Sequence, residues 1–186
     1  MVNFYERTVR MIKFSFLKLV REAILPALLL IFAKVIGVSL ANYLYNLDWF
    51  ISGGIVFNGV PLIAYRDSES LILANSFSAF IALICLALGL GWVILRAHHF
   101  HSSHVHPKVA TKLHQNGLEF LIQDSYQIYH EGAVWLSLLW FSFFLLAFQY
   151  YLGVANLLAL CVYGLAAVFL TTIFYLDIEK ELKIEG

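Results

Sequence analysis

The feature that most constrains this chain is a set of four long apolar segments, which cover residues 23–45, 71–95, 133–152 and 154–176. Each is close to the roughly 20 residues that an α-helix needs to cross the apolar core of a bilayer. A helix also satisfies its own backbone hydrogen bonds in a solvent that offers none. The sequence therefore predicts an all-α membrane protein, a bundle of four transmembrane helices.

Composition agrees with this class and excludes one kind of partner. Hydrophobic residues make up 61% and charged residues 13% of the chain, against about 45–50% and about 25% in soluble domains. The 12 basic residues are balanced by 12 acidic ones, so there is no basic excess to neutralise phosphates. We expect the lipid bilayer as a partner, and no nucleic acid.

The positive charges lie almost entirely on one side of the predicted spans. Five precede the first span, three lie in the 96–132 loop and two in the tail at 177–186, whereas the other side has only Arg66. Loops rich in lysine and arginine stay in the cytoplasm. We therefore expect an integral protein of a prokaryotic cytoplasmic membrane, with both termini and the 96–132 loop in the cytoplasm.

Residues 1–22 show the pattern of an amphipathic helix. Apolar residues recur at helical spacing between basic ones: Phe4, Val9, Ile12, Phe16 and Leu19. Such a helix lies in the membrane interface, where its lysines and arginines meet anionic lipid. The segment lacks the short apolar core and cleavage site of a signal peptide. It serves either as an anchor that sets topology or as a helix that binds a partner.

The outer loop, residues 46–70, contains a hairpin pattern. Asn58-Gly59 between two apolar groups is typical of a two-residue turn with positive φ, although Pro61 removes one donor from the ladder. This predicts a small β-ribbon at the outer surface. The alternative is a pore loop in which the segment 53–61 re-enters the membrane, which requires protein or water to cover its backbone.

A second amphipathic helix is predicted over residues 107–131. Pro107 disfavours helical geometry at His106 and suits the first position of a helix, so the chain breaks between Ser102 and His106. Polar residues then follow at steps of three or four: Lys108, Lys112, Gln115, Glu119, Gln123, Gln127 and Glu131. We expect a cytoplasmic interfacial helix that bends into the third span.

Between the second span and this helix lies a histidine-rich hinge, "AHHFHSSHVHP". In a helix that continues through residue 101, His98 and His101 share a face, and neutral imidazole binds Zn, Cu, Ni or Fe. The candidate ligands for a transition metal are His98, His101, His104, His106, His114 and His130. The sequence contains no paired CxxC units of the structural zinc type. A pH-responsive surface and an unspecialised polar interface are the alternatives.

The segment "HHFHSSH" also resembles a histidine box of the membrane desaturases and hydroxylases, which implies iron ligation on the cytoplasmic side. In those enzymes several boxes together hold a di-iron centre. Here the resemblance covers one short segment, and of the seven histidines only His114 and His130 lie outside the cluster. The pattern is incomplete, so the activity of these enzymes is not carried over to this chain.

Lys34 stands near the middle of the first span. It lies about 15 Å of helix from either end, too far for its side chain to reach water easily, and insertion there costs on the order of 3 kcal/mol. The lysine therefore needs an acceptor: the candidates inside the spans are Asn42, Asn75, Asn156 and the serine and threonine hydroxyls, or else a carboxylate of another subunit. The alternative is that the span boundaries are shifted and Lys34 lies nearer an edge.

Three functions are consistent with this pattern. The first is a non-catalytic membrane subunit or scaffold, either a homo-oligomer or joined to another membrane protein in a larger assembly. It is favoured because the chain has no sizeable soluble region and shows no nucleotide or nucleophile motif. The second is a small channel or carrier for divalent metal ions, with Lys34 in the path. The third is a metal-dependent membrane oxidoreductase.

Overall fold

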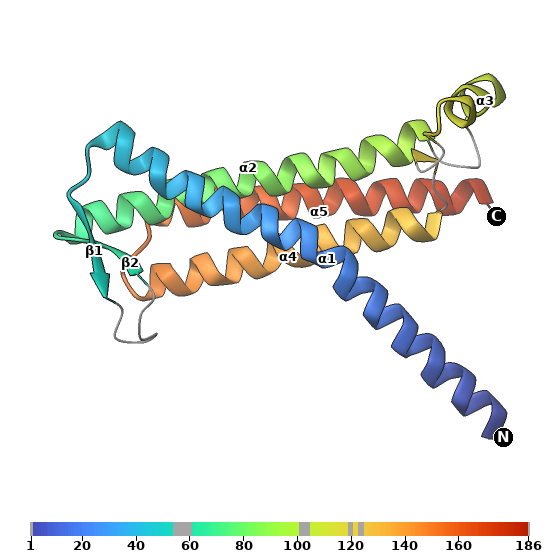
Figure 1. The fold of residues 1–186 in the computed structure, drawn as a ribbon, viewed down its shortest axis with the longest axis horizontal. Helices are drawn as coiled ribbons and strands as arrows, with labels where there is room; N and C mark the ends of the chain where they lie inside the picture. Colours follow the sequence, from blue (N-terminus) through green and yellow to red (C-terminus); the bar gives the residue numbers. More distant parts are fainter. Residues whose placement is uncertain (1, 54–60, 101–104, 119–120, 123–124, 186) are drawn as a thin grey trace. The chain divides into compact units, whose positions relative to one another are not determined.

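The computed structural model describes residues 2–53, 61–100, 105–118, 121–122 and 125–185. The chain is mostly helical (83%), with a small two-stranded sheet. The elements follow one another as Figure 1 shows: α1 (Val2–Tyr45), β1 (Trp49–Gly53), β2 (Pro61–Tyr65), α2 (Ser68–Phe100), α3 (Pro107–Gln115), α4 (Ser125–Tyr151) and α5 (Leu157–Glu185).

Four of these helices contain a stretch long and apolar enough to cross a membrane. The stretches, called spans below, are Glu22–Tyr45, Ser68–Phe100, Gln127–Tyr151 and Leu157–Asp177. They coincide with the four predicted segments, although several ends differ by a few residues. Many large apolar side chains on them are exposed, which is the expected surface when the solvent is lipid rather than water.

The first helix joins two predicted elements. The sequence predicts an amphipathic helix over 1–22 and a span over 23–45, whereas α1 continues without interruption from Val2 to Tyr45. Pro26 lies inside it and removes the hydrogen bond that an N–H would donate to the carbonyl of Glu22, but the helix does not end there. The placement of residues 1–22 in a membrane interface stays a prediction.

The two strands of the predicted ribbon are present. β1 and β2 pair antiparallel, with Trp49 opposite Tyr65 and Gly53 opposite Pro61. Alternation along such strands places successive side chains on opposite faces. The predicted turn at Asn58-Gly59, together with the re-entrant loop that was its alternative, lies outside the described residues.

Two acidic residues organise the entry to α2. Asp67 caps the helix, because its carboxylate accepts hydrogen bonds from the Ser70 N–H at 2.6 Å and from the Ser70 hydroxyl at 2.9 Å. These bonds favour the charged form and lower the pKa of Asp67. Beside the cap, Arg66 Nη1 lies 3.2 Å from Asp48 Oδ2 in an exposed ion pair. The chain therefore leaves the ribbon through a defined turn.

Helix α3 is shorter than the predicted interfacial helix over 107–131. It begins at Pro107, as predicted, but ends at Gln115. Gly117 adopts a φ of +67°, and the Leu118 N–H donates back to the Leu113 carbonyl at 2.9 Å. A glycine in this left-handed conformation ends a helix with such a return bond. The prediction of one continuous helix is therefore wrong: α3 ends at Gln115, and residues 125–131 of the predicted range belong to α4.

A glycine with positive φ also ends α4. Gly153 has a φ of +73°, and the Val154 N–H donates to the Gln149 carbonyl at 2.9 Å. Glycine adopts positive φ at no steric cost, so the chain reverses within a few residues and α5 begins at Leu157. The short connection predicted between the third and fourth spans is confirmed.

The chain divides into two compact units, each described here by itself. Unit 1 consists of Met1–Leu28, Ala87–Leu138 and Leu170–Gly186. Its buried core is formed by Leu90, Val93, Ala97, Ile128 and Phe174. Gly132 packs directly under the Phe174 ring, and a Cβ at that position would collide with it. This glycine therefore permits the close approach of α4 and α5 in unit 1.

Unit 2 consists of Leu29–Leu86 and Leu139–Phe169, and includes the ribbon. Buried residues recur every four positions from the turn before α5 into its part of that helix: Ala155, Ala159, Tyr163 and Ala167. Residues four apart lie on one face of a helix, and small side chains at such positions let helices approach closely in a membrane. This face of α5 is therefore the packed one.

Candidate functional site

The histidines of the hinge are only partly described. His98 and His99 lie in the last turn of α2, are exposed, and have ring centroids 5.1 Å apart. His106 is the residue before α3, and its Nδ1 accepts a hydrogen bond from the Lys108 N–H at 3.2 Å. His106 therefore caps a helix, a role that uses one of its two ring nitrogens.

The remaining candidates lie apart from one another along the chain. His114 is exposed on α3, whereas His130 lies inside α4, and His101 and His104 lie outside the described residues. No three His, Cys, Asp or Glu side chains come together as metal ligands within the described part of the chain. The transition-metal site at these histidines stays a prediction.

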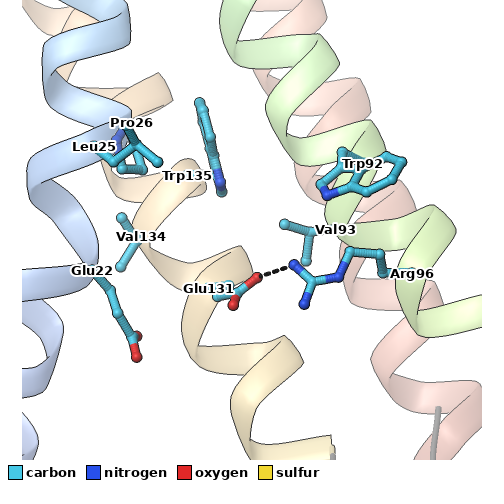
Figure 2. A pocket seen from close by; sticks show the side chains of 9 residues that line it. All are labelled: Glu22, Leu25, Pro26, Trp92, Val93, Arg96, Glu131, Val134 and Trp135. Atoms are coloured by element: carbon cyan, nitrogen blue, oxygen red, sulfur yellow. Dashed lines mark hydrogen bonds and ion pairs between the residues drawn. The ribbon is translucent and has the colours of Figure 1, made fainter. Parts of the chain in front are cut away.

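Unit 1 brings together charged side chains from three helices (Figure 2). Arg96 on α2 donates from Nη1 to Glu131 Oε2 on α4 at 3.0 Å, and their side chains are only 13% and 29% exposed. His130 Nε2 lies 3.2 Å from Glu22 Oε2 on α1, which is ion-pair distance. The angles at these two atoms do not meet hydrogen-bond geometry. Partly buried pairs of this kind are screened less than surface pairs.

These charged side chains border a pocket of about 400 Å³. Glu22, Arg96 and Glu131 line it together with two tryptophans, Trp92 and Trp135. Figure 2 shows the guanidinium of Arg96 reaching toward Glu131, with the Trp135 ring between α1 and α2. The pocket combines charges of both signs with aromatic rings, which are the groups that recognise charged ligands.

Sequence reasoning did not find this pocket. In the sequence, Arg96 is a loop cation, Glu131 is the last member of a polar stripe, and Glu22 ends an amphipathic segment. One signal was available: each of the three lies within a few residues of a span end, where charged residues of different helices share the same membrane depth.

The intramembrane lysine of unit 2 meets a serine. Lys34 Nζ on α1 donates to Ser78 Oγ on α2 at 3.2 Å, and Ser78 in turn donates to the Asn75 carbonyl at 2.9 Å. Gly37, one turn after Lys34, lies against Ser78 so closely that an added Cβ would be 2.6 Å from the Ser78 Cα. The two helices thus touch at a serine hydroxyl, one of the acceptor types expected for Lys34.

The three asparagines proposed as partners of Lys34 form other contacts. Asn75 Nδ2 donates to the Val154 carbonyl at 3.0 Å, and the Asn156 N–H donates to Ser76 Oγ at 2.9 Å. Both bonds join α2 to the segment that leads into α5. The Asn75 side chain and the Asn156 N–H therefore lie at one helix junction, and only the backbone carbonyl of Asn75 reaches the Lys34–Ser78 contact.

Asn42, the third asparagine, connects the first span to the ribbon. Its Oδ1 accepts a hydrogen bond from the Tyr65 hydroxyl at 2.8 Å. Burial raises the pKa of Tyr65, and the bond to Asn42 acts in the opposite direction. Tyr65 is therefore neutral at physiological pH and acts as a hydrogen-bond donor that ties β2 to α1.

Comparisons of the chain with protein-family models, with curated proteins and with solved structures found no match.

Proposed function

We propose that the chain is a non-catalytic integral membrane subunit or scaffold, which self-associates or joins a larger membrane assembly. The observation that carries the proposal is the contact of Lys34 with Ser78. A lysine at the middle of a span costs on the order of 3 kcal/mol to insert. In this chain that costly group holds one helix against another, which is a structural use.

The other polar groups inside the spans of unit 2 support the same function. The bonds of Asn75 to the Val154 carbonyl and of Asn156 to Ser76 also connect secondary-structure elements. Hydrogen bonds between helices stabilise membrane proteins by about 0.6 kcal/mol on average. Several such contacts in one unit favour a rigid helix framework on which other chains assemble.

A neighbouring chain needs a surface, and α4 offers one in unit 2. Phe141, Phe144 and Phe148 are 60%, 63% and 58% exposed. Their spacing of three and four places them on one face of the helix. Aromatic side chains supply large contact areas with few rotatable bonds, so this face suits a second membrane helix as well as it suits lipid.

The proposal is tested by extracting the tagged full-length chain in a mild detergent and recording native mass spectra. We expect a discrete complex heavier than one chain. Lys34→Leu should leave insertion unharmed or improve it, because the insertion cost is removed, and should reduce the amount of complex. Lys112→Leu, which changes an exposed lysine on α3, is the matched control and should leave the complex intact.

The same spectra and a flux assay separate the other two functions. A wild-type chain that is monomeric and conducts divalent ions in liposomes, with flux lost in Lys34→Leu, would replace the proposal with a channel or carrier. Stoichiometric bound iron would instead support an oxidoreductase. Metal binding that depends on His98 and His101 would place that metal at the hinge.

A further inference from the structure

The pocket of unit 1 has two layers, and each of its three helices contributes to both. On α1 the charged residue is Glu22 and the apolar ones are Leu25 and Pro26, one turn further along the helix. On α4 the charged residue is Glu131, and Val134 and Trp135 follow one turn later. In each case the charge lies at the span end and the apolar residues lie deeper.

Helix α2 repeats this order in the opposite chain direction. Arg96 lies four residues before the end of its span at Phe100, and Trp92 and Val93 lie one turn deeper. Four residues of helix correspond to about 6 Å. The charged layer is therefore at the boundary between hydrocarbon and headgroups, and the apolar layer is at the depth where acyl chains begin.

The charged layer contains an incompletely used donor. A guanidinium has five N–H groups in a planar fork. Among the described residues the Arg96 side chain donates to Glu131 alone, and its Nε is buried without an acceptor. A buried unsatisfied donor costs about 1–3 kcal/mol. Arginine forks match the geometry of phosphate, so a phosphate oxygen at this position would remove that cost.

The same layer contains acceptors for a cation. Glu131 and Glu22 each present a carboxylate to this layer, and a carboxylate has about four lone-pair sites. The rings of Trp92 and Trp135 border the same space (Figure 2), and a cation over a tryptophan face is stabilised by about 0.5–2 kcal/mol. A purely anionic ligand would leave these groups unused and meet the two carboxylates.

We infer that this pocket binds the headgroup of a zwitterionic aminophospholipid. The phosphate lies on the Arg96 guanidinium, the primary ammonium lies by Glu22 and Glu131, and the start of an acyl chain lies along Trp92 and Trp135. The pocket volume of about 400 Å³ is in the range of small-ligand sites. It suits a headgroup, whereas the acyl chains remain in the bilayer.

The test uses the full-length chain in detergent, with native mass spectra recorded after addition of phosphatidylethanolamine or phosphatidylglycerol that carry identical acyl chains. We expect one retained phosphatidylethanolamine per chain. Retention of phosphatidylglycerol should be weaker by about tenfold or more, because this lipid lacks the ammonium that donates charged hydrogen bonds to Glu22 and Glu131. Equal retention of the two lipids would overturn the inference without the need for any variant.

Two variants locate the site. Arg96→Gln should weaken retention of phosphatidylethanolamine by about tenfold or more, whereas Arg66→Gln, which removes an exposed arginine of the ribbon end, should leave it unchanged. Unchanged retention in Arg96→Gln would overturn the inference. If Arg96→Gln does not fold, Trp135→Leu serves as the second variant, because it keeps an apolar wall but removes the aromatic face. Retention of phosphatidylethanolamine by Trp135→Leu should also fall. Retention equal to that of the wild type would overturn the inference.

A competition experiment distinguishes the lipid from its free headgroup. Soluble glycerophosphoethanolamine carries the same phosphodiester and ammonium charges but no acyl chains, so it should not displace the lipid at equal concentration. Displacement at equal concentration would show that the apolar layer contributes nothing, and would overturn the assignment to a lipid. None of these outcomes bears on the complex expected under the proposed function, because that experiment measures association between chains.

Discussion

At the scale of single residues, polar side chains in this protein act through pairs whose members lie far apart in the sequence. The need of Lys34 for an acceptor could be predicted from its depth in a span. Its partner Ser78 could not, because the chain offers many serines and the rotation of α2 decides which one faces α1. Gly37 contributes to that choice, since its missing side chain lets Ser78 approach.

We predict that Gly37→Ala destabilises unit 2 by about 1–3 kcal/mol, the usual cost of overpacking a well-packed site. The added Cβ would lie 2.6 Å from the Ser78 backbone, and backbone does not move aside as a flexible side chain does. The midpoint of thermal unfolding in detergent, followed by circular dichroism, should fall.

The matched control is Gly91→Ala on α2. A Cβ at Gly91 meets nothing within 4 Å, so the gain in helix propensity of roughly 0.5–1 kcal/mol should hold or raise the midpoint. A midpoint for Gly37→Ala as high as that of Gly91→Ala would show that the close α1–α2 contact does not contribute to stability.

At the scale of elements, local signals set the ends of helices. Pro107 marks a helix start that the sequence predicts correctly. The polar stripe has a helical period that continues to Glu131, although α3 stops at Gln115, just before the positive φ of Gly117. A helical spacing of polar residues shows which residues would share a face of one continuous helix. It does not show that the helix is continuous.

The cap of α2 leads to a prediction of pH dependence. The pKa of Asp67 is lowered from its ordinary value of 3.8 by the hydrogen bonds from Ser70. A lowered pKa in the folded state means that the cap contributes stability at pH values above the unfolded pKa and loses it as the pH falls through the folded pKa. Amide-exchange protection of Ser70, corrected for intrinsic rates, should therefore be constant at neutral pH and fall below about pH 4.

The Asp67→Asn variant provides the control. An asparagine still accepts the Ser70 N–H bond but does not titrate, so its protection should show no step in acid. A step of the same size in both proteins would assign the effect to another group and remove Asp67 as its cause.

At the scale of the whole molecule, four spans predict that both termini lie on one side of the membrane, and the distribution of lysine and arginine predicts that this is the cytoplasmic side. Two single-cysteine variants test this in a chain that lacks Cys85 and Cys161. Glu69→Cys in the first turn of α2 should react with an impermeant maleimide on intact cells, and Thr111→Cys on α3 should react only after lysis. The reverse pattern would invert the orientation.

The sequence by itself determined which four segments are long and apolar enough to span a membrane, where the ribbon lies, and that a lysine inside a span requires a partner, because these follow from local composition and periodicity along one chain. Only the tertiary structure decided that Lys34 meets Ser78 and that Glu22, Arg96 and Glu131 border one pocket with two tryptophans. These contacts join helices separated by tens of residues. Their identity depends on how each helix is rotated and at what depth it packs, which no pattern within a single helix specifies.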